Sequence, residues 1–129
     1  APADLSGVRL LLKALKRHEA VGMLPDQVPG TGEGQWADFF GRPAYTMTLG
    51  ARLSETARTT VLLAFAERLP AGRGFNLRFS APSQPIAGTQ AERVAAINRV
   101  LEDLIRSCPQ QYLWGYNRYK APRGTEPPP

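Results

Sequence analysis

The sequence predicts an α/β fold in which helices cover a mixed sheet. Segments with apolar residues at helical spacing alternate with segments that are continuously apolar or that alternate apolar and polar residues. Along the chain they give the order helix, strand, helix, strand, strand, helix, which is an α/β pattern. With 129 residues, of which 43% are hydrophobic, the chain is large and apolar enough to form a core.

The first two predicted elements are a helix and a short strand. The helix runs from Ser6 to about His18, because its apolar residues share one face and its cations collect in the last turn, where the helix dipole favours them. Asp4 or Ser6 can cap its start. The apolar run 20–24, which ends at Pro25, is typical of a buried strand.

The middle of the chain predicts a second helix and a hairpin. Residues 46–57 read as a helix whose small side chains permit close packing on a sheet. Residues 60–66 are continuously apolar, which is typical of a strand covered on both faces. Residues 75–80 alternate with the period of a half-buried strand, and the turn residues in 69–74 allow the two strands to pair as a hairpin.

The last helix has the clearest signals. Thr89 and Glu92 form a capping box at its start, and the helix stops at Pro109. The single cysteine, Cys108, excludes an intrachain disulfide and a cysteine-rich zinc site, and we interpret it as a buried structural thiol. The apolar face of this helix comprises Val94, Ile97, Leu101, Leu104 and Ile105.

The charge of the chain is positive and its basic residues are scattered. The net charge is +5, and all but three of the 16 basic residues are arginine. Such a protein is attracted to anionic lipid, to nucleic acid or to an acidic carrier protein, although a simple bias toward arginine codons explains the composition equally well. No apolar run approaches the ~18 residues of a membrane-spanning helix.

The usual catalytic residue types do not form a recognisable active site. The glycine-rich loop 30–34 lacks the endings of a phosphate-binding or dinucleotide-binding motif, so we interpret it as a flexible loop. His18, the only histidine, follows a helix end among basic residues and fits an exposed capping role. We therefore expect no catalytic residue, no metal site and no cofactor in this chain.

Asp26 and Gln27 are the best candidates for binding. They follow the predicted strand 20–24, and ligands of open α/β sheets bind beyond the carboxyl ends of strands. Asp26 can accept a hydrogen bond from a hydroxyl, whereas Gln27 can both donate and accept. The alternative is an ordinary turn after Pro25 that is closed by the aspartate.

Five short segments, in this order and spacing, resemble the lipid A biosynthesis lauroyl and myristoyl acyltransferases. The resemblance covers nearly the whole chain, roughly from Leu5 to Lys120. The segments are Val21–Gln27, Gly32–Gly34, Phe39–Ala44, Pro109–Trp114 and Arg118–Lys120.

The resemblance implies an activity and a setting. Members of this family transfer an acyl chain from acyl carrier protein to a hydroxyl of a lipid A precursor, at the cytoplasmic face of the bacterial inner membrane, and have a glycerolipid acyltransferase-like fold. The implied partners are thus acyl carrier protein, the lipid A precursor and the membrane surface, but no nucleic acid.

The resemblance also implies that a catalytic part is missing. The family signature, a histidine followed after four residues by an acidic residue, lies in an N-terminal half after a membrane anchor. His18 is followed at that spacing by Met23 and lies just before the later motif, so it cannot be the signature histidine. We expect residues 1–120 to be the C-terminal part of an acyltransferase domain that is inactive alone, and 121–129 to be a disordered proline-rich tail.

In the resemblance, Asp26 and Gln27 face the reaction centre, and Arg42 follows in the next motif. Arg42 could pair with a phosphate of the acceptor lipid or form a structural ion pair. Many relatives carry His-Arg where this chain has Tyr116 and Asn117.

Two other functions fit the sequence. One is a non-catalytic basic module that binds anionic lipid, or nucleic acid through stacking on the aromatic and basic stretch 112–120. The other is an independently encoded remnant that has lost catalysis.

Overall fold

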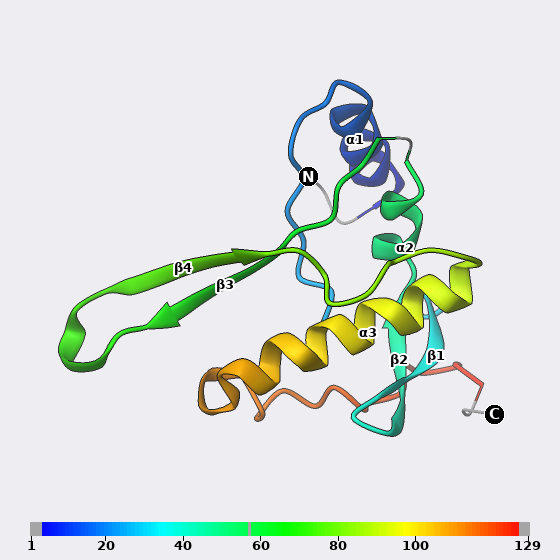
Figure 1. Ribbon diagram of the computed structural model, residues 1–129. Coiled ribbons are helices and arrows are strands. Elements are labelled where there is room, and N and C mark those ends of the chain that lie inside the picture. Colours follow the sequence, from blue (N-terminus) through cyan, green and yellow to red (C-terminus); the bar gives the residue numbers. More distant parts are fainter. Residues whose placement is uncertain (1–3, 57, 127–129) are drawn as a thin grey trace.

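The computed structural model describes residues 4–56 and 58–126. It confirms a chain of mixed helices and strands, but the strands form two separate antiparallel pairs, β1–β2 and β3–β4, and not one mixed sheet. Figure 1 shows the long helix α3 beside the first pair, whereas the second pair extends away as an arm. The helices are α1 (Leu5–Lys16), α2 (Leu49–Ser54) and α3 (Gln90–Ser107), with short 3₁₀ turns at Pro70–Gly72 and Pro109–Gln111; the strands are β1 (Gly34–Phe39), β2 (Arg42–Met47), β3 (Leu63–Arg68) and β4 (Phe75–Ser80).

The core lies where α3 packs on β1, β2 and α2. One cluster joins Phe39 and Ala44 of the first hairpin to Ile105 near the end of α3. A second cluster joins Ala51 of α2 to Val94 and Ile97 near the start of α3. Burying each large apolar side chain stabilises the fold by roughly 1.5–3 kcal/mol. The predicted apolar face of α3 is confirmed, since its five members are buried or half-buried.

The predicted starts of the first and last helices are confirmed. The Asp4 carboxylate accepts from the backbone N–H groups of Ser6 (2.8 Å) and Gly7 (3.0 Å), which caps α1. The capping box of α3 is complete, because Glu92 N–H donates to Thr89 Oγ1 (3.3 Å) while Thr89 N–H donates to the Glu92 carboxylate (2.7 Å).

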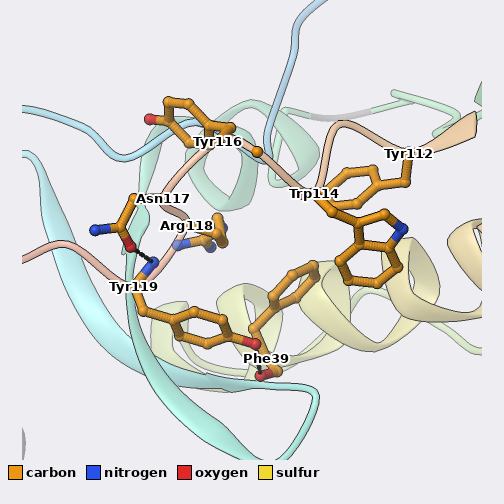
Figure 2. Close-up of a pocket in the computed structure, with 8 residues that line it drawn as sticks. Phe39, Tyr112, Trp114, Tyr116, Asn117, Arg118 and Tyr119 are labelled. Atoms are coloured by element: carbon orange, nitrogen blue, oxygen red, sulfur yellow. Dashed lines mark hydrogen bonds between the residues drawn. The ribbon is translucent and has the colours of Figure 1, made fainter.

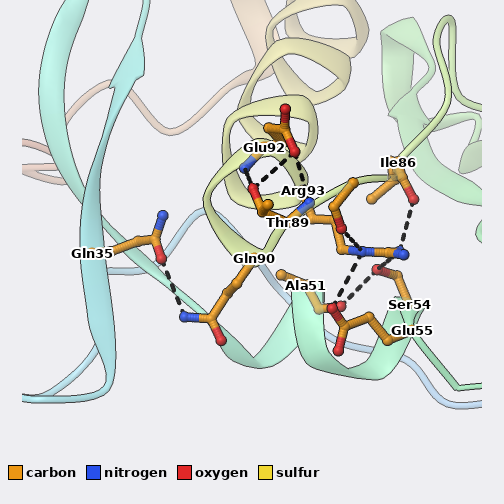
Figure 3. A network of polar contacts seen from close by, with 10 residues as sticks. Gln35, Ala51, Ser54, Glu55, Ile86, Thr89, Gln90, Glu92 and Arg93 are labelled. Carbon is orange, nitrogen blue, oxygen red and sulfur yellow. Dashed lines mark hydrogen bonds and ion pairs between the residues drawn. The ribbon is translucent and has the colours of Figure 1, made fainter.

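An arginine network holds α2 against the start of α3 (Figure 3). Arg93 Nη1 donates to Ser54 Oγ (3.3 Å) and to the carbonyl of Ile86 (3.0 Å), and Nε donates to the carbonyl of Gly88 (2.9 Å). Glu55 adds an ion pair with Nε at 3.4 Å. One side chain thereby joins the end of α2, the loop before α3 and α3 itself.

The predicted second helix, over 46–57, begins too early, because its first residues belong to the hairpin β1–β2. Thr46 and Met47 belong to β2, and α2 has only six residues; position 57, where we expected the helix to end, lies outside the described residues. Phe40 and Gly41 form the two-residue turn with positive φ values of 50° and 72°, as the right-handed twist of a tight hairpin favours. The Phe40 N–H donates to Glu102 of α3 (2.8 Å), so the turn is held by the helix.

The predicted strand 20–24 is wrong. This segment belongs to no strand among the described residues, and Leu24 is 69% exposed. An apolar run makes a strand only where a neighbouring strand takes up its backbone hydrogen bonds. Asp26 therefore does not follow a strand end.

The second hairpin is confirmed, but its expected burial is wrong. β4 spans the predicted residues and pairs with β3, which runs 63–68 where we expected a strand over 60–66. All six residues of β4 are exposed, and β3 alternates between half-buried and exposed. The register places Phe75, Leu77 and Phe79 on one face, which is apolar and largely open to solvent.

Two features concern the ends of the chain. Cys108 is buried after α3, as predicted. We expected disorder over residues 121–129, but the tail contacts the region of the first hairpin as far as Glu126. The backbone carbonyl of Glu126 accepts a hydrogen bond from Trp36 Nε1, and that of Arg123 accepts one from Thr31 Oγ1 (both 2.8 Å). Residues 127–129 lie outside the described residues. None of the described helices is both long and apolar enough to span a bilayer.

Candidate functional site

The segment after α3 forms a pocket of about 300 Å³ with the end of β1 (Figure 2). Aromatic rings make most of its wall. The rings of Tyr112 and Trp114 pack edge-on with their centroids 4.9 Å apart, and those of Phe39 and Tyr119 pack at a tilt with their centroids 6.3 Å apart. The lining residues are Phe39, Tyr112, Trp114, Gly115, Tyr116, Asn117, Arg118 and Tyr119.

Arg118 is the polar centre of this region and is only 2% exposed. Its Nη1 donates to the carbonyl of Tyr45 (2.9 Å), and its Nη2 donates to Thr46 Oγ1 (2.8 Å) and Asn98 Oδ1 (3.4 Å). Asn98 in turn donates to Thr46 Oγ1 (3.1 Å) and to the carbonyl of Asp38 (2.9 Å). This buried network joins β1, β2, α3 and the C-terminal segment.

A hydrogen bond brings the turn that contains Asp26 to the pocket. The N–H of Val28 donates to the hydroxyl of Tyr116 (2.8 Å). Asp26 and Gln27 lie in the turn just before Val28. The contact joins two segments that are 88 positions apart, and it makes the Asp26 turn part of the same region as the aromatic wall.

The Asp26 carboxylate acts electrostatically on Tyr112 and Arg118. Burial, followed by the negative charge of Asp26, raises the pKa of Tyr112 to about 12. Burial lowers the pKa of Arg118 from its ordinary value, whereas the nearby phenol of Tyr112 and the Asp26 charge act in the opposite direction. Asp26, Tyr112 and Arg118 therefore form one electrostatic group, with a carboxylate acceptor beside a phenol and a guanidinium.

The predicted site residues are separated. Asp26 belongs to this group, whereas Gln27, next to it in the turn, is exposed. Arg42 is exposed at the start of β2, with its guanidinium carbon 4.2 Å from the ring centroid of Tyr119. That ring also lines the pocket, so a cation–π contact links Arg42 to the site through Tyr119.

Sequence reasoning gave Tyr112, Tyr116 and Arg118 no part in the acyltransferase site, and considered them only within the alternative stacking stretch 112–120. Tyr112 and Arg118 lie in two of the segments that carry the family resemblance, which was the available signal. Their proximity to Asp26 depends on how the chain folds back over β2, and no local pattern encodes it.

The remaining candidates behave as structural residues. His18 is exposed after the end of α1 with a φ of 62°, which fits the predicted capping position. Among the described residues, no group of three or more histidine, cysteine, aspartate or glutamate side chains could hold a metal ion. The arrangement around Asp26 can bind a hydroxyl or orient a polar group, but it pairs no nucleophile with a base.

Comparison with known proteins gives the same family over nearly the whole chain. A family model described as bacterial lipid A biosynthesis acyltransferase matches residues 3–121. The chain is 32% identical, over 125 residues, to the lipid A biosynthesis lauroyltransferase of Escherichia coli (strain K12), covering 95% of this chain and 40% of that protein. It is 30% identical, over 120 residues, to the lipid A biosynthesis palmitoleoyltransferase of the same strain and to a lipid A biosynthesis acyltransferase of Shigella flexneri, covering 90% of this chain and 38% of each. The chain thus spans about two fifths of the length of these relatives.

Proposed function

Because the chain belongs to the family of bacterial lipid A biosynthesis acyltransferases, we propose that it is part of an enzyme that transfers an acyl chain from acyl carrier protein to a hydroxyl of a lipid A precursor. The family expected from the short motifs is confirmed. In this proposal the enzyme has a glycerolipid acyltransferase-like fold and works at the cytoplasmic face of the bacterial inner membrane.

The proposal divides the work between this chain and the rest of the protein. A segment outside the present sequence supplies the catalytic histidine and acid, and the 129 residues are inactive alone. The net charge of +5 supports attraction to an acidic carrier protein and to an anionic lipid surface. The rings of Phe39, Tyr112, Trp114 and Tyr119 pack on each other and on neighbouring rings, which disfavours the alternative in which they stack on nucleic acid bases.

One observation carries the proposed role of this chain: Asp26 lies beside a buried phenol and a buried guanidinium at an aromatic pocket. A carboxylate held in this way can accept a hydrogen bond from the acceptor hydroxyl and orient it for attack on the thioester. Gln27 is exposed next to it and can contact the same substrate. Arg42, exposed beside Tyr119, can pair with a phosphate of the lipid.

The test is Asp26→Asn in the complete enzyme. A lost charged hydrogen bond in the transition state is worth roughly 1.5–3 kcal/mol, or about 10- to 150-fold in rate. We expect kcat/KM for acyl transfer to fall at least tenfold while the thermal midpoint moves only a few degrees.

Asp38→Asn is the matched control, because Asp38 has an exposed side chain on β1. It should leave kcat/KM unchanged. Near-wild-type transfer by Asp26→Asn would contradict the functional role and leave Asp26 as a turn residue. If that variant loses both folding and activity, Gln27→Ala in the same assay decides whether the turn contacts substrate.

A further inference from the structure

Two buried polar atoms at the pocket have no hydrogen-bond partner among the described residues. They are the hydroxyl of Tyr112 and the Nε of Arg118, and both residues line the pocket. Buried polar side chains in folded proteins nearly always have a partner, because an unpaired group forfeits its hydration without compensation. Both atoms can donate a hydrogen bond, so this region lacks an acceptor.

The Asp26 carboxylate is the acceptor that the structure provides nearby. The bond from Val28 to Tyr116 holds its turn against the aromatic segment, and its charge acts on both Tyr112 and Arg118. The phenol of Tyr112 stays protonated at physiological pH, because burial and that charge raise its pKa to about 12. The hydroxyl can therefore serve as a donor to a carboxylate.

We propose that Tyr112 is a positioning residue for Asp26: its buried hydroxyl donates to one carboxylate oxygen and leaves the other oxygen to accept from the acceptor hydroxyl of the substrate. The inference rests on the proposed function and adds a residue to it. Arg118, fixed by its bonds to β2 and α3, keeps a positive charge beside the same carboxylate.

The two neighbouring tyrosines have other contacts: Tyr119 uses its proton on a backbone carbonyl, and Tyr116 accepts from the backbone of the Asp26 turn. The hydroxyl of Tyr119 donates to the carbonyl of Phe39 (2.8 Å), and the hydroxyl of Tyr116 accepts from Val28 N–H (2.8 Å). Tyr45 provides a matched control outside the pocket lining, because its buried hydroxyl accepts from the N–H groups of Gly32 (3.2 Å) and Gly34 (3.3 Å), and Tyr45→Phe removes that hydroxyl without removing a donor to Asp26.

The experiment compares Tyr112→Phe and Tyr45→Phe in the complete enzyme, by steady-state acyl transfer and by thermal unfolding. We expect Tyr112→Phe to lower kcat at least fivefold with little change in KM, and to move the thermal midpoint by only a few degrees, since the lost bond fixes a carboxylate in a half-buried turn and not in the core. Tyr45→Phe should show the reverse, a lower thermal midpoint with kcat/KM unchanged, because its hydroxyl has two backbone partners outside the site. Wild-type kcat in Tyr112→Phe would overturn the proposal.

A double-mutant cycle with Asp26→Asn separates this inference from the proposed function. If Tyr112 acts through Asp26, adding Tyr112→Phe to Asp26→Asn causes no further loss of kcat. An equal loss in both backgrounds would overturn the positioning role while leaving the role of Asp26 intact. Wild-type activity of Asp26→Asn alone would instead refute the proposed function of Asp26, and the positioning role with it.

Discussion

Arg118→Met should destabilise the protein strongly, because it removes the centre of a buried polar network. Two of the three hydrogen bonds of Arg118 are short, at 2.8 and 2.9 Å. Bonds to a charged donor contribute about 1.5–3 kcal/mol each, which gives about 3–6 kcal/mol together. The methionine needs no desolvation of a charge and keeps part of the volume, and both effects offset some of this loss. We expect a decrease of about 3 kcal/mol in the free energy of unfolding, or about 10 °C in the thermal midpoint.

Arg42→Met is the matched control. Both arginines lie over an aromatic ring, Arg42 over Tyr119 (4.2 Å) and Arg118 over Phe39 (5.1 Å), but Arg42 is exposed. An exposed cation–π contact is worth about 0.5–1 kcal/mol, so this variant should lose only a few degrees. Urea unfolding of the 129-residue protein can be followed by the fluorescence of Trp114, which lines the pocket.

A loss smaller than about 1 kcal/mol in Arg118→Met would refute the reasoning, because the network would then be worth no more than a surface contact. Equal losses in the two variants would also refute it, since burial would then make no difference between them.

Four further predictions concern other parts of the chain. The exposed apolar face of β4 should make the 129-residue protein self-associate at micromolar concentration, and Leu77→Ser with Phe79→Ser should reduce this in analytical ultracentrifugation; a wild-type monomer would contradict it. Thr89→Ala should cost about 1 kcal/mol in urea unfolding, through loss of the α3 cap. Hydrogen bonds from Thr89 lower the pKa of Glu92 in the folded protein. The stability that Glu92 contributes should therefore be present above its unfolded-state pKa and be lost as the pH falls through its lower folded-state pKa. Circular dichroism in acid would detect this loss. The 129 residues alone should transfer no acyl chain, and His18→Ala should not alter this result. Acyl transfer that His18→Ala abolishes would overturn both the predicted inactivity and the interpretation of His18 as a capping residue.

The elements that the sequence predicted well are those with local signals. The start of α3 follows from the reciprocal bonds of Thr89 and Glu92, and the bounds of β4 follow from its period of two. The hairpin β1–β2 escaped prediction for two local reasons. Its turn places Phe40 at a positive φ, where glycine or asparagine is usual, and Pro43 lies within β2, where it normally argues against a strand.

The candidate site could be predicted only in part. Asp26 was predicted as a binding residue from a strand end and from the family resemblance; the strand end is wrong, and the binding role stays a prediction. Tyr112 and Arg118 lie near Asp26 because the C-terminal segment folds back across β2. That packing depends on the buried hydrogen bonds of Arg118 to β2, and no spacing in the sequence reveals it. The predicted burial of the second hairpin was wrong, because an apolar run shows which side chains a strand could bury but not whether another element packs over them.

Because the β3–β4 hairpin projects from the core, we expect it to unfold locally while the rest of the chain stays folded. Each of its strands pairs with only one other strand among the described residues. At the end of β3, the side-chain amide of Gln111 accepts from the Arg68 N–H (2.7 Å) and donates to the Arg68 carbonyl (3.0 Å), as a residue of a neighbouring strand would. A two-stranded hairpin is marginally stable in water, so this arm should open at a much lower free energy than α3. Its amide protons would then exchange with solvent long before those of the core, and a protease would cut its glycine-rich turn while α3 and the first hairpin remain folded.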